Sequence, residues 1–485
     1  MKRYKSFAYF ALGSVIGSVL LWALSGNNPE YVSAYMLVGL TGFLLGIPLS
    51  KIVSGESPWY GPHAITLLAF FMMYVAAPAV AMWLGPWSDY YTRNLTGSEL
   101  NFMMLVAFTG ILFYILGNRL GPKNPKVPRG IEWYFTDTPA VQSLFPIMTG
   151  LVFGVGLAAW AYAYAVTGGV GAHLTDLGGN RPELNAAAGG ITLHLRKFVW
   201  IGAALWMSRY GLRISTFIIV GLAAIPLLLY GSRSFIAILF VGCFIVWRFR
   251  WTPKVPKIVW AGMAAGLIVL MSGYVLLRQT EGNVTEAAAS YKSMISSTEG
   301  KVAALTGAFT YVGPMSEMLQ EVGDKVPYQY GRTFGALLFV IPTALWPQQT
   351  EVFTGMGRLY TESLFPRRAG KITITPSIMT EYYVNFGWLG IIACSFFQGW
   401  LTKWFEGVLI GNPHRKYQVA WIAFAAVFSV NLLRVMKDSV GTLAFALYFA
   451  LPVIIVYWPN IGLLFSPPPE PTGFDDDEAG DEAYE

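Results

Sequence analysis

Arginine side chains at the edges of apolar stretches are the most prominent chemical groups in this sequence. Arg233 lies in Tyr230-Gly231-Ser232-Arg233-Ser234, between two apolar runs with almost no loop, and Arg278 ends a later run. The planar guanidinium binds phosphate oxygens through two parallel hydrogen bonds and keeps its charge when partly buried. The other arginines predicted to bind substrate are Arg196, Arg332, Arg358 and Arg434. These positions indicate a phosphate-bearing substrate; the alternative is that single loop arginines pair with loop acids or lipid headgroups.

An acid and a histidine at similar positions are the candidates for proton transfer. Glu381 lies where the chain returns to an apolar stretch, in Thr380-Glu381-Tyr382-Tyr383-Val384-Asn385-Phe386-Gly387. A carboxylate there would accept a proton from a substrate hydroxyl, or else serve as the structural partner of an arginine. His194 would act as a base or bind phosphate, or else form a polar packing contact. Tyr382 and Asn385 are further candidates for substrate binding.

Side chains that bind metals are few and scattered. Both cysteines lie inside apolar runs, the four histidines show no ligand spacing, and the only Asp-x-Asp pattern lies in the acidic C-terminal tail. Zinc and divalent-cation sites need several such side chains at short spacing. The sequence therefore predicts a reaction that uses no metal and no other cofactor.

The composition indicates a chain that lies mostly in lipid. Hydrophobic residues make up 55% of the 485 positions, charged residues 12%, and the mean hydropathy is +0.50. An ordinary globular domain has roughly 25% charged residues. A water-soluble enzyme, a nucleic-acid-binding protein and a disordered scaffold are therefore excluded as the main interpretations.

About 12 stretches are long and apolar enough to cross the membrane as helices, each of about 20 residues. Short loops rich in Lys and Arg, at 119–129, 248–257 and 403–416, fall on one side of the membrane together with Lys2, Arg3 and Lys5. Such loops are cytoplasmic, so both termini are predicted to be cytoplasmic. The predicted spans are 7–25, 33–52, 63–84, 99–118, 142–166, 192–208, 213–230, 233–249, 257–277, 378–401, 417–433 and 440–463.

The predicted fold is an all-α integral membrane protein, a GT-C-like polytopic bundle with one large extracytoplasmic loop. The domains are nine spans in 1–277, the loop in 278–377, three spans in 378–465 and a disordered acidic tail in 466–485. A loop of this length is too long to serve only as a connection. We expect its segment 284–305 to be helical, and the apolar segment 331–346 to enter the membrane part-way or lie on the bundle.

Three motifs in the second half resemble the Wzy family of O-antigen and exopolysaccharide repeat-unit polymerases, which are relatives of the O-antigen ligases. Gly231-Ser232-Arg233-Ser234 opens a span, Ile341-Pro342-Thr343-Ala344-Leu345-Trp346-Pro347 lies in the large loop, and Glu381-Tyr382-Tyr383-Val384-Asn385-Phe386-Gly387-Trp388-Leu389-Gly390 follows it. The similarity covers approximately 225–400. The first half resembles the family only in hydropathy and in the number of spans.

The resemblance implies a metal-independent, inverting glycosyltransferase of the bacterial inner (plasma) membrane. Such an enzyme transfers a growing glycan from undecaprenyl diphosphate onto a lipid-linked repeat unit at the outer leaflet. Arg233, Arg278 and Glu381 match the family's arginine at a span edge, its basic residue opening the loop and its acid before the Asn-Phe-Gly turn. The implied partners are the undecaprenyl-diphosphate-linked oligosaccharide, membrane lipids, a chain-length regulator and a flippase, with no nucleic acid.

Three other functions remain open from the residues alone. A lipid-linked oligosaccharide flippase also has about a dozen spans and cationic residues, but would place charge near mid-membrane within two related halves. An O-antigen ligase uses the same donor with another acceptor. A non-catalytic assembly scaffold would not need arginines and an acid embedded at the membrane edge.

Overall fold

The computed structural model describes ten stretches of the chain, with residues 346–348 and a few single positions between them. These stretches are 31–54, 61–79, 95–122, 134–175, 194–230, 233–251, 312–335, 352–368, 375–410 and 450–465. Every named secondary-structure element within them is a helix, and the one β-type pairing there is an isolated bridge between Val322 and Val326.

Five helices in these stretches are long and apolar enough to cross a membrane. They coincide with the predicted spans 33–52, 63–84, 99–118, 142–166 and 378–401, so this part of the chain is that of an α-helical membrane protein. The five are α2 (Val32–Val53), α3 (Pro62–Phe71) with its continuation η2 (Met72–Ala76), α5 (Gly97–Leu120), α7 (Pro139–Val166) and α19 (Ile378–Ile410).

Two further apolar helices, α11 (Ile214–Tyr230) and α12 (Arg233–Trp251), coincide with the predicted spans 213–230 and 233–249. The predicted spans 7–25, 257–277 and 417–433 lie outside the described residues, as does the first part of 440–463. A total of about 12 spans therefore stays a prediction.

The predicted span 192–208 is interrupted by a turn at 196–197. Helix α10 runs only from Phe198 to Tyr210, 13 residues or about 20 Å, which is short of the hydrocarbon thickness of about 30 Å. Arg196 and Lys197 lie in a turn before it. Thr192, His194 and Leu195 are helical as well, so the turn at 196–197 divides the predicted span into two helical parts.

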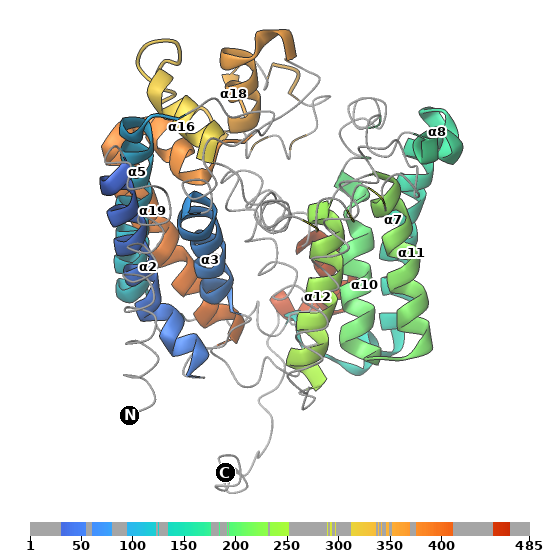
Figure 1. Cartoon of the computed structure of the whole chain (residues 1–485). Coiled ribbons are helices and arrows are strands. Elements are labelled where there is room, and N and C mark those ends of the chain that lie inside the picture. Colours follow the sequence, from blue (N-terminus) through green and yellow to red (C-terminus); the bar gives the residue numbers. More distant parts are fainter. Residues whose placement is uncertain are drawn as a thin grey trace, which may run out of the picture.

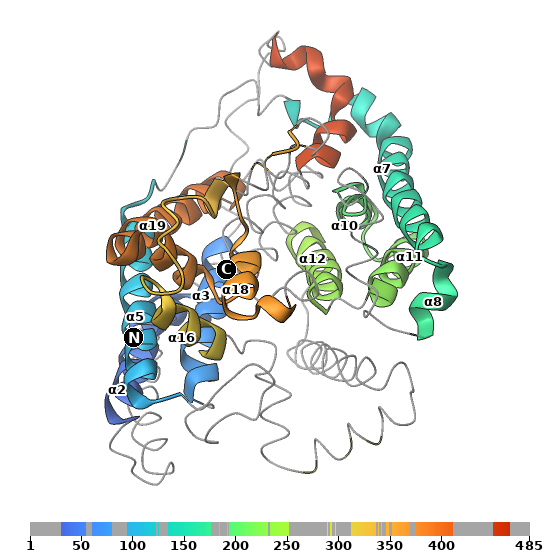
Figure 2. The same ribbon diagram turned by 90° about the horizontal axis from the view of Figure 1, so that it is seen from above.

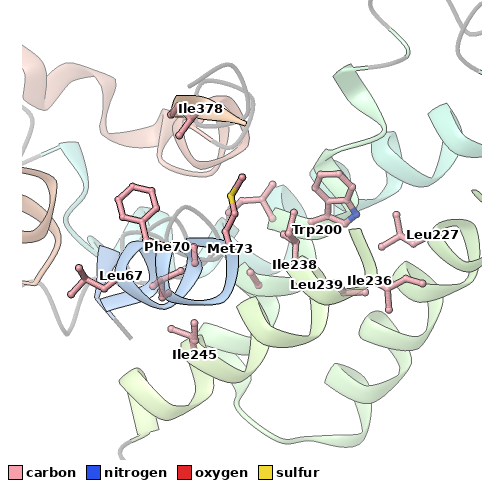
Figure 3. Close-up of a cluster of buried hydrophobic side chains, with 14 of the residues drawn as sticks. Leu67, Phe70, Met73, Trp200, Leu227, Ile236, Ile238, Leu239, Ile245 and Ile378 are labelled. Atoms are coloured by element: carbon pink, nitrogen blue, oxygen red, sulfur yellow. The ribbon is translucent and has the colours of Figure 1, made fainter. Parts of the chain in front are cut away.

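The described spanning helices form two groups, α2, α3, α5 and α19 on the left of Figure 1 and α7, α10, α11 and α12 on the right. Within them, α5 packs against α19 and α2, and α10 packs against α7, α11 and α12. Figure 2 shows the same division from above. One cluster of buried hydrophobic side chains includes residues of both groups. Figure 3 labels part of it, including Phe70 of α3, Met73 of η2, Ile378 of α19, Trp200 of α10 and Ile238 of α12.

Glycines bring the backbones of α5 and α19 into contact. A side chain at Gly117 would overlap the carbonyl oxygen of Phe396, and one at Gly399 would overlap that of Tyr114. Asn118 Nδ2 donates a hydrogen bond to the Gly399 carbonyl oxygen at 3.3 Å. Small residues allow this close approach between helices in membranes. The α5–α19 contact therefore fixes the position of α19, which carries Glu381.

Large apolar side chains are exposed along the outward faces of several helices. In water such a surface would aggregate, whereas lipid tails solvate it without cost. The exposed residues on α7 and α11 include Ile147, Leu151, Val155, Ile214, Phe217, Ile218 and Ile225. These faces therefore agree with burial in a bilayer.

Residues 450–465 are joined by hydrogen bonds to the residues that precede α7. Tyr457 OH donates to Asp137 Oδ1 at 2.5 Å, and Asn460 Nδ2 donates to the carbonyl oxygens of Tyr134 and Thr136 at 2.9 and 2.7 Å. The segment forms the 3-10 helix η7 (Trp458–Leu464) at its end. These bonds place the residues before α7 and the end of the last predicted span at the same end of the molecule.

Two short helices lie within the predicted extracytoplasmic loop, α16 (Val312–Glu321) and α18 (Met356–Leu364), and the sequence did not predict either. They lie together at one end of the left-hand group (Figure 1). Tyr360 OH of α18 donates to Glu317 Oε2 of α16 at 2.6 Å. Their small hydrophobic cluster also includes Val384 of α19, so these helices pack over the first turns of α19. The predicted helix 284–305 lies outside the described residues apart from single positions.

Candidate functional site

Glu381 lies in the first turn of α19 and is fully buried. Ser377 caps the helix: its Oγ accepts a hydrogen bond from the Thr380 backbone N–H at 3.1 Å, and its carbonyl oxygen accepts from the Glu381 N–H at 3.0 Å. A side-chain oxygen at this position replaces the helix bonds that the first turn lacks. Ser377 Oγ also contacts Met315 Sδ of α16 at 3.4 Å. The fold therefore holds the acid at a capped helix start, under α16.

Helix α19 is broken at Phe386 and Gly387, just over one turn beyond Glu381. Phe386 has φ −142° and ψ 19°, and Gly387 has φ 59° and ψ −142°. Glycine adopts a positive φ at little cost because it lacks a Cβ atom. Beyond the break, a side chain at Gly390 would overlap the carbonyl oxygen of Tyr382. The break therefore separates a short segment, 378–385, from the long remainder of the helix.

Asn385 joins this short segment to residues 329–333. Its Nδ2 donates to Thr333 Oγ1 at 2.6 Å and to the Glu381 carbonyl oxygen at 2.7 Å. Its Oδ1 accepts from the backbone N–H of Gly331 at 2.8 Å. The residue is fully buried, and an amide nitrogen has two hydrogens to donate. Both amide hydrogens therefore bind protein groups.

Tyr382 and Arg332 complete this group of predicted site residues. Tyr382 is buried, and its OH donates to Gln398 Oε1 at 3.0 Å across the break in α19. Arg332 is exposed, and its Nε donates to the Val352 carbonyl oxygen at 2.9 Å. The fold therefore gathers Glu381, Tyr382, Asn385 and Arg332 around the start of α19, with the acid buried and the arginine at the surface.

Arg196 lies in a second place, among aromatic rings of the other helix group. Its side chain is 2% exposed, and Cζ lies 4.6 Å from the ring centroid of Trp160 and 5.9 Å from that of Tyr230. Trp160 Nε1 donates to the Arg196 carbonyl oxygen at 3.0 Å. The negative face of an aromatic ring attracts a guanidinium, most strongly where water is excluded. The aromatic rings therefore help to retain a buried cation at this point.

Tyr230 connects Arg196 to the motif that contains Arg233. Tyr230 is the last residue of α11, and Arg233 is the first residue of α12. The side chain of Arg233 lies outside the described structure. His194 Nδ1 lies 3.4 Å from Lys197 Nζ, so this nitrogen accepts the hydrogen bond from the ammonium group. The fold thus brings the 194–197 turn next to the end of α11.

The remaining predicted site residues are not gathered in either place. Arg358 is exposed on α18 and forms an ion pair with Glu362, 2.6 Å from Nε to Oε1, the alternative that the sequence left open for a loop arginine. Arg278 and Arg434 lie outside the described residues. Within the described part of the chain, no group of three or more His, Cys, Asp or Glu could hold a metal ion.

Sequence reasoning missed Trp160, Thr333 and Ser377, which position the predicted residues. Thr333 and Asn385 are 52 positions apart, and no spacing rule relates residues so distant. Ser377 carries a local signal, since a serine just before an apolar run is typical of a helix cap. Trp160 lies inside a span that contains other aromatic residues, and nothing local distinguishes it from them.

We expect Arg196→Lys to lower the free energy of unfolding by about 1 kcal/mol, because an ammonium lacks the planar face that lies over Trp160. Thermal unfolding in detergent, followed by tryptophan fluorescence, measures the change. Arg213→Lys is the matched control: Arg213 lies 5.9 Å from the Tyr210 ring but is exposed, so its effect should stay within about 0.5 kcal/mol. Equal losses in both variants would contradict the role given to burial.

The chain was compared with protein-family models, with curated proteins and with solved structures, and none of the three comparisons found a match. Function is therefore inferred from the residues and their arrangement.

Proposed function

We propose that the protein is a Wzy-type polysaccharide polymerase of the bacterial inner membrane, which extends a glycan carried on undecaprenyl diphosphate. The observation that carries the proposal is the arrangement at the start of α19. A fully buried acid, Glu381, lies on a helix of membrane-spanning length and is joined through Asn385 to the segment that presents Arg332. A buried ionisable residue in such a helix is costly, which makes function its default explanation.

The proposed reaction needs one proton acceptor and cations near the leaving group. The acceptor hydroxyl oxygen forms a bond to the anomeric carbon, and the bond from that carbon to the diphosphate oxygen breaks. The electron pair leaves with the diphosphate, and the hydroxyl proton passes to the Glu381 carboxylate. Guanidinium groups stabilise the charge that develops on the diphosphate, the role assigned to Arg332 and Arg233. Attack from the face opposite the diphosphate inverts the anomeric carbon.

The decisive experiment uses the full-length protein in proteoliposomes with a synthetic undecaprenyl-diphosphate repeat unit and no added metal. Polymerisation gives a ladder of products separated by one repeat unit on a gel. A single larger product formed only when lipid A core is supplied would identify a ligase. An unchanged repeat unit in this assay would reject both glycosyltransferase functions.

The second candidate function is a lipid-linked oligosaccharide flippase, favoured by the division of the described helices into two groups (Figure 2). Two groups that move against each other are a common basis of alternating access. A translocation assay in sealed vesicles separates the two functions. Movement of the lipid-linked unit between leaflets without a change in its size would favour the flippase.

We expect Arg233→Ala to abolish chain extension while membrane insertion stays normal, because the variant removes a cation proposed to face the diphosphate. Arg233→Lys should recover little of the activity, since a point charge lacks the fork that binds two phosphate oxygens. Product length on gels and membrane abundance on immunoblots measure the two effects. Full recovery with lysine would show that simple charge neutralisation is sufficient.

A further inference from the structure

At the break in α19, two backbone carbonyl groups accept hydrogen bonds from a segment outside the helix. In a continuous helix the carbonyl oxygens of Val384 and Asn385 would accept from amides four residues later, beyond Gly387. In this structure the Val384 carbonyl accepts from the Gln329 N–H at 2.9 Å and the Asn385 carbonyl from the Tyr330 N–H at 3.2 Å. The segment 329–333 therefore completes the end of the short first helix segment.

The turn within 329–333 has a backbone that needs such support. Tyr330 has φ 47° and Gly331 has φ 91°. A positive φ is uncommon for a bulky residue and persists only where the surroundings hold it in place. The Gly331 N–H, at the centre of this turn, donates to Asn385 Oδ1 at 2.8 Å. The shape of the turn is thus fixed by its bonds to α19.

The side chain of Asn385 connects the segments that carry Glu381, the proposed proton acceptor, and Arg332, the proposed cation at the diphosphate. One amide hydrogen binds the carbonyl oxygen of Glu381, and the amide nitrogen also donates to the hydroxyl of Thr333, the residue that follows Arg332. A single buried side chain therefore links the turn that carries the acid to the turn that carries the exposed arginine.

We propose that Asn385 is a positioning residue that fixes Arg332 relative to Glu381, so that a cation and a proton acceptor act on one bound substrate. This role rests on the proposed function. Asn385 acts through the two other residues and does not contact the substrate. A fixed relative position matters because errors of about 1 Å in such geometry reduce rates by about 100-fold.

The first test removes the hydrogen bond between Asn385 and Thr333 and leaves Glu381 and Arg332 unchanged. Thr333→Val removes the oxygen that accepts from Asn385 Nδ2 and keeps the shape of the side chain. We expect it to raise the Kd for undecaprenyl diphosphate in nanodiscs by about tenfold, the effect of one lost hydrogen bond. Thr41→Val is the matched control, since Thr41 is a buried threonine of α2 whose Oγ1 bonds to the Leu37 carbonyl of its own helix at 2.7 Å. Equal Kd values in wild type and Thr333→Val would overturn the proposal.

A double-mutant cycle distinguishes positioning from a general structural effect. If Thr333 acts through Arg332, adding Thr333→Val to Arg332→Ala produces no further increase in Kd. Residues that act independently give effects that multiply. Multiplying effects would therefore overturn the positioning role even if each single variant binds more weakly.

Hydrogen exchange tests the connection without any substrate. Asn385→Ala should increase amide exchange at least about tenfold in peptides covering 326–335, because the Gly331 N–H loses its acceptor. Unchanged exchange would overturn the proposal. If the protein binds undecaprenyl diphosphate and gives the expected result in the double-mutant cycle, yet makes no polymer, the polymerase function is refuted and the positioning role of Asn385 is retained. If the Thr333→Val variant polymerises normally, the positioning role of Asn385 is refuted and the polymerase function is retained.

Discussion

The Glu381→Gln variant should make no glycan polymer, with the rate of chain extension falling by about 100-fold or more. An amide of the same shape cannot take the proton of the acceptor hydroxyl, and general-base catalysis contributes about 100- to 10,000-fold. Glu381 is fully buried, and glutamine has nearly the same shape, so the packing around position 381 is kept. Product ladders from purified protein and thermal unfolding in detergent measure the two properties.

Glu321→Gln is the control for this experiment. Glu321, the last residue of α16, forms a surface ion pair with Lys325, 2.8 Å from oxygen to nitrogen. A pair of this kind contributes little to stability, about 0.3–0.5 kcal/mol, and it has no assigned role in the reaction. Normal ladders from both variants would reject Glu381 as the base. Loss of the ladder together with a large loss of stability would assign Glu381 a structural role.

The Gly399→Val variant should lower the stability of the protein by about 3 kcal/mol or more, the upper part of the range for overpacking. A side chain there would overlap the Tyr114 carbonyl oxygen of α5, and a backbone atom cannot rotate away as a flexible side chain can. The two helices must separate, which also breaks the bond from Asn118 to the Gly399 carbonyl. Thermal unfolding in detergent measures the loss.

Gly154→Val on α7 is the matched control for that substitution. Gly154 is exposed, and a side chain there would meet no atom within 4 Å. Its effect should stay within about 0.5 kcal/mol, as for most surface substitutions. If both variants are equally unstable, helix propensity and not the α5–α19 contact controls the result.

Much of the helical framework follows from local sequence. Apolar runs of about 20 residues predicted α2, α3, α5, α7 and α19, because a chain in lipid must satisfy its backbone hydrogen bonds within each segment. The sequence also located Glu381 at the start of an apolar run, and the structure shows it buried in the first turn of α19. These properties depend on residues that are close together in the chain.

Other features depend on contacts that local patterns do not describe. Helices α16 and α18 are short and partly polar, and they are stabilised by packing with Val384 and by the bond between Tyr360 and Glu317. Helix α10 begins at Phe198, after the turn in which Arg196 lies among aromatic rings from α7 and α11. Hydropathy records neither kind of contact.

The sequence by itself determined that this protein is helical, apolar and rich in arginine at the ends of its spans, because composition and short-range periodicity suffice for those properties. Only the tertiary structure decided which of these residues meet. The side chain of Asn385 contacts Thr333, and the Asn385 carbonyl, next to the break at Gly387, bonds to Tyr330, each more than fifty positions away. Such a contact depends on the path of the whole chain, so no local pattern of residues predicts it.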